Sequence, residues 1–137
     1  MSAADFFDTN ILLYLLSADK IKADRAEQLL AAGGCVSVQV LNEFAAVAAG
    51  KLAMKLAEIR EVLSTIRAVC AVKPVELETH VLGLELAERY RYSIYDSMIL
   101  AAALRAGCST LFSEDFQHGQ KIDRLTIVNP FRSGRTD

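Results

Sequence analysis

The sequence predicts a three-layer α/β/α domain, in which helices cover both faces of a mostly parallel central sheet. Short apolar runs alternate with helical segments along the chain, which is typical of parallel strands joined by helices. The runs are continuously apolar, as expected for strands covered on both faces. Because the chain has 137 residues, of which 53% are hydrophobic, we expect one domain over residues 1–137, with an ordered core over 1–132 and a short tail.

The first predicted strand is the aromatic pair Phe6-Phe7, which ends at Asp8. Apolar residues then continue as the start of a helix over residues 11–16. A second helix is predicted over residues 19–32, because apolar residues recur along it and Gly33 stands where helices commonly stop.

The second predicted strand is the short β-branched run over residues 35–38, and a helix over 39–49 follows it. The next segment, residues 53–69, has apolar residues at steps of three and four with charged residues between them. This spacing predicts an amphipathic helix. Its apolar positions are Leu56, Ile59, Leu63 and Ile66.

The remaining chain predicts three more short strands and two more helices. In order, they are a strand over 69–72, a helix over 76–89, an Ala- and Leu-rich helix over 95–105, and strands over 110–112 and 125–128. Gly107 stands at the stop position of the helix predicted over residues 95–105. In open sheets of this kind, ligands bind beyond the carboxyl ends of the strands.

Charge and cysteine content narrow the class of protein. The formal charge of −2 argues against a basic protein that coats DNA. No basic residue precedes Lys20 and no uncharged stretch is long enough to span a bilayer, so we expect a cytoplasmic protein with no secretory signal and no membrane association. The three cysteines are far apart in the sequence and form no CxxC pair, which predicts small buried side chains in a reducing compartment.

A few acidic residues stand alone in apolar surroundings, whereas most acids lie on charged helical faces. Each follows a predicted strand or lies near the start of a predicted helix, at the edge of the sheet where α/β folds build sites. They are Asp8, Glu43, Asp96 and the adjacent pair Glu114-Asp115.

Convergence of these carboxylates would need a counter-charge. Two like charges about 4 Å apart repel by roughly 4 kcal/mol at an effective dielectric of about 20. Carboxylate oxygens without Cys or His are the ligands that suit Mg²⁺ or Mn²⁺. Such an ion can polarise a phosphoryl oxygen and activate a water molecule, so the cluster predicts phosphate chemistry.

Other interpretations of the same residues are open at this stage. Asp8 and Asp96 would each serve as an ordinary helix N-cap, in which case the chain would be a non-catalytic domain that binds a partner. A phosphoryl-transfer protein is a further alternative. An aspartyl-phosphate phosphatase would want a second Asp where Asn10 stands, and a receiver domain would want an acid pair at the end of the first strand.

Four acidic motifs in this order resemble the successive motifs of the PIN-domain family, most closely those of the VapC-like toxins of bacterial toxin–antitoxin pairs. The resemblance extends over nearly the whole chain. The motifs are residues 6–12 (FFDTNIL), 40–44 (VLNEF), 95–99 (YDSMI) and 111–115 (LFSED).

The resemblance implies a magnesium- or manganese-dependent endoribonuclease that cleaves RNA with a metal-activated water, a cognate antitoxin, and a homodimer. Transfer RNA is the family-level expectation for the substrate. The carried-over catalytic acids and metal ligands are Asp8, Glu43, Asp96 and Asp115, with Glu114 as the other candidate for the fourth acid. Thr9, Asn10 and Ser113 match polar positions that orient the acids or the water. Tyr14, Tyr95 and the cysteines are interpreted as packing residues.

Overall fold

The computed structural model describes residues 4–132, so the predicted tail lies outside the described residues. In this part of the chain, six strands form one sheet in the order β3-β2-β1-β4-β6-β5. All neighbouring strands are parallel except β5 and β6, which confirms the mostly parallel sheet. The strands are β1 (Asp5–Phe7), β2 (Gly34–Ser37), β3 (Cys70–Lys73), β4 (Thr110–Phe112), β5 (Lys121–Ile122) and β6 (Leu125–Val128).

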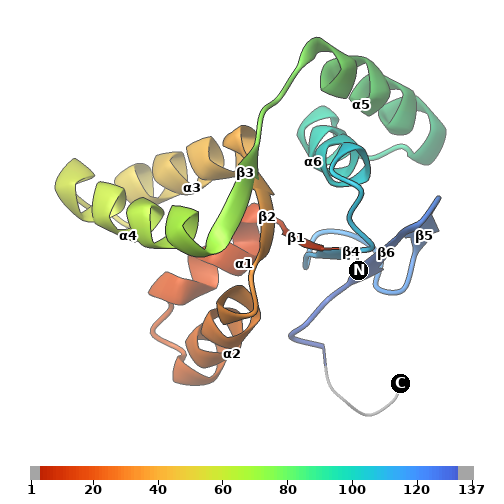
Figure 1. The fold of residues 1–137 in the computed structure, drawn as a ribbon. Helices are drawn as coiled ribbons and strands as arrows, with labels where there is room; N and C mark the ends of the chain where they lie inside the picture. Colours follow the sequence, from red (N-terminus) through yellow and green to blue (C-terminus); the bar gives the residue numbers. More distant parts are fainter. Residues whose placement is uncertain (1–3, 133–137) are drawn as a thin grey trace.

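Helices cover both faces of this sheet, as predicted for a three-layer fold. Figure 1 shows α1 to α4 on one side of the strands and α5 and α6 on the other. The reason is that β1, β2 and β3 succeed one another in one direction across the sheet, whereas the chain then returns past β1 to β4. Right-handed crossovers in opposite directions place their helices on opposite faces. The helices are α1 (Thr9–Leu13), the 3₁₀ helix η1 (Tyr14–Leu16), α2 (Lys20–Ala31), α3 (Val38–Gly50), α4 (Leu56–Val69), α5 (Leu77–Tyr90) and α6 (Ile94–Arg105).

The strand order reverses at β1, between its neighbours β2 and β4. The register pairs Phe7 with Phe112, and the Asp8 N–H donates to the Phe112 carbonyl at 3.0 Å. Asp8 and Ser113, the residues that follow the two strands, therefore lie side by side at the carboxyl edge of the sheet. This is the topological switch point, where α/β folds bind ligands.

The core lies on both faces of the central strands. Phe6 and Phe7 of β1 point to opposite faces and are fully buried, and the largest side chains around them come from the flanking helices, including Phe44 of α3 and Leu100 of α6. Burial of each such side chain contributes about 1.5–3 kcal/mol to folding. The short strand β1 is therefore held rigidly, and so is the residue that follows it.

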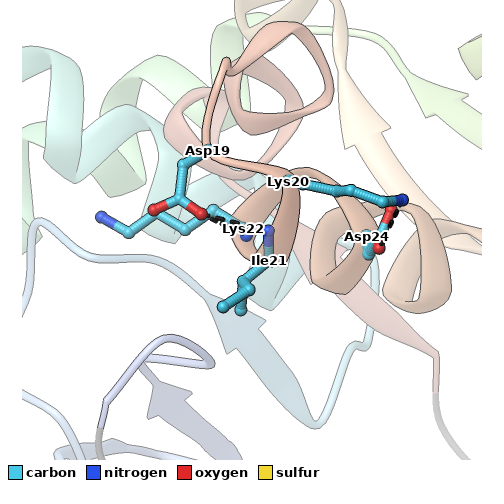
Figure 2. Close-up of polar contacts among 5 residues, drawn as sticks. All are labelled: Asp19, Lys20, Ile21, Lys22 and Asp24. Carbon is cyan, nitrogen blue, oxygen red and sulfur yellow. Dashed lines mark hydrogen bonds and ion pairs between the residues drawn. The ribbon is translucent and has the colours of Figure 1, made fainter.

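Local capping rather than packing sets the start of α2. The carboxylate Oδ1 of Asp19 accepts the backbone N–H groups of Ile21 at 3.0 Å and Lys22 at 3.3 Å, and the Lys20 ammonium pairs with Asp24 at 3.3 Å (Figure 2). The Ile21 side chain is 82% exposed. The helix predicted over residues 19–32 is thus confirmed, with Asp19 as its N-cap.

Several predicted boundaries are wrong, three of them for reasons that the structure shows. Val38 opens α3 rather than ending the second strand, because the Ser37 hydroxyl caps the helix by accepting the Val40 N–H at 3.3 Å. Helix α4 begins at Leu56 rather than at residue 53, because Ala53 adopts a left-handed conformation with φ of 50°. The first helix begins at Thr9 rather than at residue 11, because Asp8 caps it there.

The sequence prediction also missed β5. This strand has only two residues and pairs antiparallel with β6 across a tight turn. A two-residue strand is too short to show an alternation of apolar and polar residues, so the sequence pattern does not indicate it.

Gly34 is the position where β2 leaves no room for a side chain. A Cβ there would lie 2.7 Å from the Asp5 carbonyl oxygen and 2.6 Å from the Phe7 ring. We expect Gly34→Ala to lower the free energy of unfolding by about 1–3 kcal/mol, because backbone must shift to admit the methyl group. Urea unfolding measures this loss. Gly50→Ala is the matched control, since a Cβ at Gly50 meets no atom within 4 Å; an equal loss in both variants would contradict the argument.

Candidate active site

Asp8 occupies the centre of the site and also caps a helix. Its side chain is 2% exposed, and it lies between the end of β1 and the start of α1. One carboxylate oxygen, Oδ1, accepts the Thr9 N–H at 2.7 Å. The other, Oδ2, accepts the Ser113 hydroxyl at 2.6 Å. The capping interpretation of Asp8 is therefore correct, and it does not exclude a second role, because Oδ2 also accepts the Asn10 amide, which donates to Asp115 as well.

The pKa of Asp8 is raised to about 7. Burial is the largest cause, because it penalises the charged carboxylate. The hydrogen bonds from Ser113 and Thr9 oppose this effect, and the negative charges of Asp115 and Asp96 add to it. Asp8 is thus a carboxyl group that is only partly ionised near pH 7, and a bound cation would favour its charged form.

Glu43 reaches the site from α3. Its Oε1 accepts the Thr9 hydroxyl at 2.9 Å, and its Oε2 accepts the Gln39 side-chain amide at 2.8 Å. The same amide also donates to the backbone carbonyl of Tyr95 in α6 at 3.1 Å. Glu43 is therefore fixed relative to three elements, α1, α3 and α6.

Asp96 lies in the first turn of α6 but is not its cap. Ser93 caps this helix, since its hydroxyl accepts the Asp96 N–H at 3.1 Å. The capping interpretation of Asp96 is therefore wrong. Burial raises the pKa of Asp96, and repulsion from Asp115 and Glu43 raises it further, while Ser93 opposes the shift. Its carboxylate thus shares the space of the other acids.

The adjacent acids Glu114 and Asp115 are directed to different partners. Asp115 accepts the Asn10 side-chain amide at 3.0 Å and repels both Asp8 and Asp96. Glu114 accepts the Tyr14 hydroxyl at 2.7 Å, and this hydrogen bond is the largest cause of a raised Tyr14 pKa. Only Asp115 of the pair contributes to the group formed by the other acids.

Neutral donors separate the four acids, here called the acid site (Asp8, Glu43, Asp96 and Asp115). The three polar residues singled out from the sequence all lie among them: Thr9 donates to Glu43, Ser113 to Asp8, and Asn10 to both Asp8 and Asp115. Within residues 4–132, the ion pairs are Lys20–Asp24 and Arg105–Glu76. None of them compensates the acid site.

The fit of a metal ion to this site can be judged from its donors. In the described part of the chain, no three Asp, Glu, His or Cys side chains are arranged so that they could hold an ion as they stand. The acids nevertheless offer oxygen atoms only, which suits a hard cation such as Mg²⁺ that keeps several water ligands. Burial raises the pKa values of Asp8 and Asp96, and the neighbouring acids raise them further, so a bound cation would favour the charged carboxylates.

Two features of the site were not predicted correctly. Tyr95 was interpreted as a packing residue, but its side chain is 70% exposed, because the first turn of α6 faces outward while the residues from Ser97 onward are buried. Gln39 was missed, although it precedes Glu43 by one helical turn, a spacing that places two side chains together on a helix. The cysteines Cys35, Cys70 and Cys108 are buried and free, as predicted.

The strand order and the position of the acids define a doubly wound α/β protein with an acidic site at its topological switch point. The chain belongs to the PIN-domain family, since the family model described as "PIN domain" matches residues 6–123. No curated protein sequence matches the chain. None of the described helices is long and apolar enough to span a bilayer.

Several solved structures share this fold at low sequence identity. A toxin–antitoxin complex from Klebsiella pneumoniae is 21% identical, with a TM-score of 0.72 over 95% of this chain and 100% of the other. VapC20 of Mycobacterium tuberculosis, described as a toxin that cleaves the sarcin–ricin loop, is 21% identical, with a TM-score of 0.66 over 82% and 92%. DNA-bound VapBC from Salmonella typhimurium is 19% identical, with a TM-score of 0.65 over 91% and 96%.

Proposed function

We propose that this protein is an endoribonuclease dependent on Mg²⁺ or Mn²⁺, and that it is the toxin of a toxin–antitoxin pair. The observation that carries the proposal is the acid site: four carboxylates repel one another at the switch point, and no basic side chain in the described residues pairs with them. Membership of the PIN-domain family and the fold shared with a toxin that cleaves RNA support the same reaction.

In this proposal Asp8, Asp96 and Asp115 hold the metal ion, and Glu43 completes the set. The ion, when bound, supplies positive charge to a phosphoryl oxygen and lowers the pKa of a water molecule. Ser113 and Thr9 fix the carboxylate of Asp8 through its two oxygens. Both are short hydrogen bonds from neutral donors, so they orient Asp8 without removing its charge.

Glu43 is proposed to accept the proton of the attacking water. Both of its oxygens are already positioned by neutral donors, Thr9 and Gln39, so the carboxylate is held at one place without a cationic partner. The water attacks the phosphorus in line with the departing 3′ oxygen. The products would be a 5′-phosphate and a 3′-hydroxyl, and no covalent intermediate is needed.

The other elements of the proposal are a cognate antitoxin, a homodimer and a cytoplasmic location. The antitoxin is supported by the shared fold with a toxin–antitoxin complex and with DNA-bound VapBC, whereas the homodimer and the location follow from the family resemblance alone. The phosphatase alternative has less support, because the position where a phosphatase would want a second Asp is filled by Asn10, whose amide donates to two of the acids. The receiver-domain alternative has less support, because Asp8 at the end of the first strand is followed by Thr9 rather than by a second acid.

Removal of divalent ions tests the proposed reaction. We expect the purified protein to cut transfer RNA or a single-stranded oligoribonucleotide with Mg²⁺ or Mn²⁺, to lose this activity in EDTA, and to regain it when the ion is added back, because no basic side chain of residues 4–132 pairs with the acid site. End-group analysis of the fragments should give 5′-phosphates. Equal cleavage with and without EDTA would contradict the proposal, and phosphorylation of Asp8 by acetyl phosphate would favour the receiver-domain alternative.

A further inference from the structure

A second concave surface adjoins the acid site where the start of α3 faces the start of α6. It is an open cavity of about 510 Å³, here called the Tyr95 cavity, and it is lined by Gln39, Asn42, Glu43, Ala46 and Tyr95. Glu43 belongs both to this cavity and to the acid site. Whatever occupies the Tyr95 cavity would therefore lie directly beside a group bound at the acid site.

The Tyr95 ring is free while its backbone is fixed. The side chain is 70% exposed, although the residues that follow Asp96 in α6 are buried. The Tyr95 carbonyl accepts the amide of Gln39, which also holds Glu43. This shared amide fixes the Tyr95 backbone relative to Glu43, so the exposed ring is presented next to the proposed reaction centre.

We propose that the Tyr95 cavity binds one unpaired base of the RNA substrate, stacked on the Tyr95 ring, next to the phosphate that is cut. This inference rests on the proposed ribonuclease function. Single-stranded RNA is recognised largely by stacking of splayed bases on aromatic side chains. The exposed side chain of Asn42 offers a donor and an acceptor to the edge of the same base.

The charge of the cavity favours a base over a phosphate. Its lining contains the carboxylate of Glu43 and no Lys or Arg, so a phosphate group would be repelled there. A separate cavity lies farther along α3, and its lining includes Asn10, Lys51 and the acid Glu114. An RNA strand whose phosphate lies at the acid site would thus place a neutral base, rather than a second phosphate, at Tyr95.

The test compares Tyr95→Ala with Tyr95→Phe, and uses Leu56→Ala as a matched control. Leu56 is also a large exposed side chain, at 66%, but it lies at the start of α4 and lines neither cavity. The substrate is an oligoribonucleotide that the wild-type protein cleaves. We expect Tyr95→Ala to raise its KM on the order of tenfold with a smaller change in kcat, because stacking of one base is lost. Tyr95→Phe, which keeps the ring, should remain near the wild-type KM.

Abasic substitution identifies the base. An abasic nucleotide is placed at each position around the cut in turn. At one position the abasic nucleotide should raise the KM of the wild-type protein about as much as the Tyr95→Ala substitution does. At that position it should not raise the KM of the Tyr95→Ala variant any further. The inference would be overturned if Tyr95→Ala raised KM no more than Leu56→Ala does. It would also be overturned if the effects of Tyr95→Ala and of the abasic nucleotide on KM were fully additive at every position. A change in oligomeric state with unaltered KM would overturn it too, and would assign the ring to contacts between protein chains.

Failure of the proposed function is distinguishable from failure of this inference. If the wild-type protein cuts no RNA with either ion, the ribonuclease proposal fails, and binding is then measured with an oligoribonucleotide that carries 2-aminopurine. Quenching of its fluorescence in the wild type and in Leu56→Ala, but not in Tyr95→Ala, would support the base site. Equal quenching in all three proteins would overturn it.

Discussion

Asp8→Asn is expected to reduce metal-dependent RNA cleavage on the order of a hundredfold or more while the fold is retained. The reason is that the substitution removes one negative charge from the acid site but keeps the shape of the side chain. The Asn carbonyl oxygen can still accept the Thr9 N–H that Asp8 accepts at 2.7 Å, so the start of α1 keeps its cap. We expect the same loss for Asp96→Asn, which caps no helix. Cleavage rates under saturating Mg²⁺ measure both effects.

Asp5→Asn is the control for this prediction. Asp5 is the first residue of β1, so it lies at the amino end of the strand, whereas Asp8 follows the carboxyl end. The Asp5→Asn variant should therefore cut RNA at the wild-type rate. Circular dichroism and a thermal unfolding scan establish that each variant is folded. Full cleavage by Asp8→Asn or Asp96→Asn would remove the acid site from the proposed mechanism.

The same assay separates the two adjacent acids. Asp115→Asn should lose far more activity than Glu114→Gln, because Asp115 repels Asp8 and Asp96 whereas Glu114 is held by the Tyr14 hydroxyl. The sequence left these two residues as alternatives. Neighbouring residues in a loop can point in different directions, and what separates them here is Tyr14, which lies 100 positions away.

The acid site was predictable because parallel strands end at one edge of a sheet. Asp8 follows β1 and Ser113 follows β4, and the pairing of Phe7 with Phe112 brings them together. The apolar runs in the sequence indicated both strands and therefore both positions. Each of these acids also stands apart from basic residues in the sequence. In agreement with this, none of them forms an ion pair among residues 4–132.

Side-chain direction was less predictable than position. Tyr95 lies in an apolar segment, which favoured burial, yet only the later turns of α6 face the core. Likewise, Cys35 and Cys108 are far apart in the sequence but form a side-chain contact, because they lie near the starts of strands that flank β1. Neither outcome follows from local periodicity, since each depends on how separate elements pack.

Asp8→Asn is also expected to stabilise the metal-free protein at neutral and higher pH. The pKa of Asp8 is about 7 in the fold, against about 3.9 for an unperturbed Asp. The folded protein therefore binds the proton more tightly than the unfolded chain does, so the contribution of Asp8 to stability is greatest below pH 4 and is lost as the pH rises to 7. A difference of roughly 3 pH units corresponds to about 4 kcal/mol as an order of magnitude.

Unfolding by urea in EDTA, from pH 4 to pH 8.5, measures this effect. The two proteins should have similar stability near pH 4, where Asp8 is protonated, and Asp8→Asn should become progressively more stable than the wild type until about pH 7. Its amide can face Ser113, whose hydroxyl can rotate to accept it. Asp5→Asn should show a much smaller pH-dependent gain, because Asp5 is only partly buried. Mg²⁺ should narrow the gap by stabilising the charged carboxylate of the wild type alone. A constant difference at every pH would mean that burial does not raise the Asp8 pKa, and the acid site would then need no cation to compensate it.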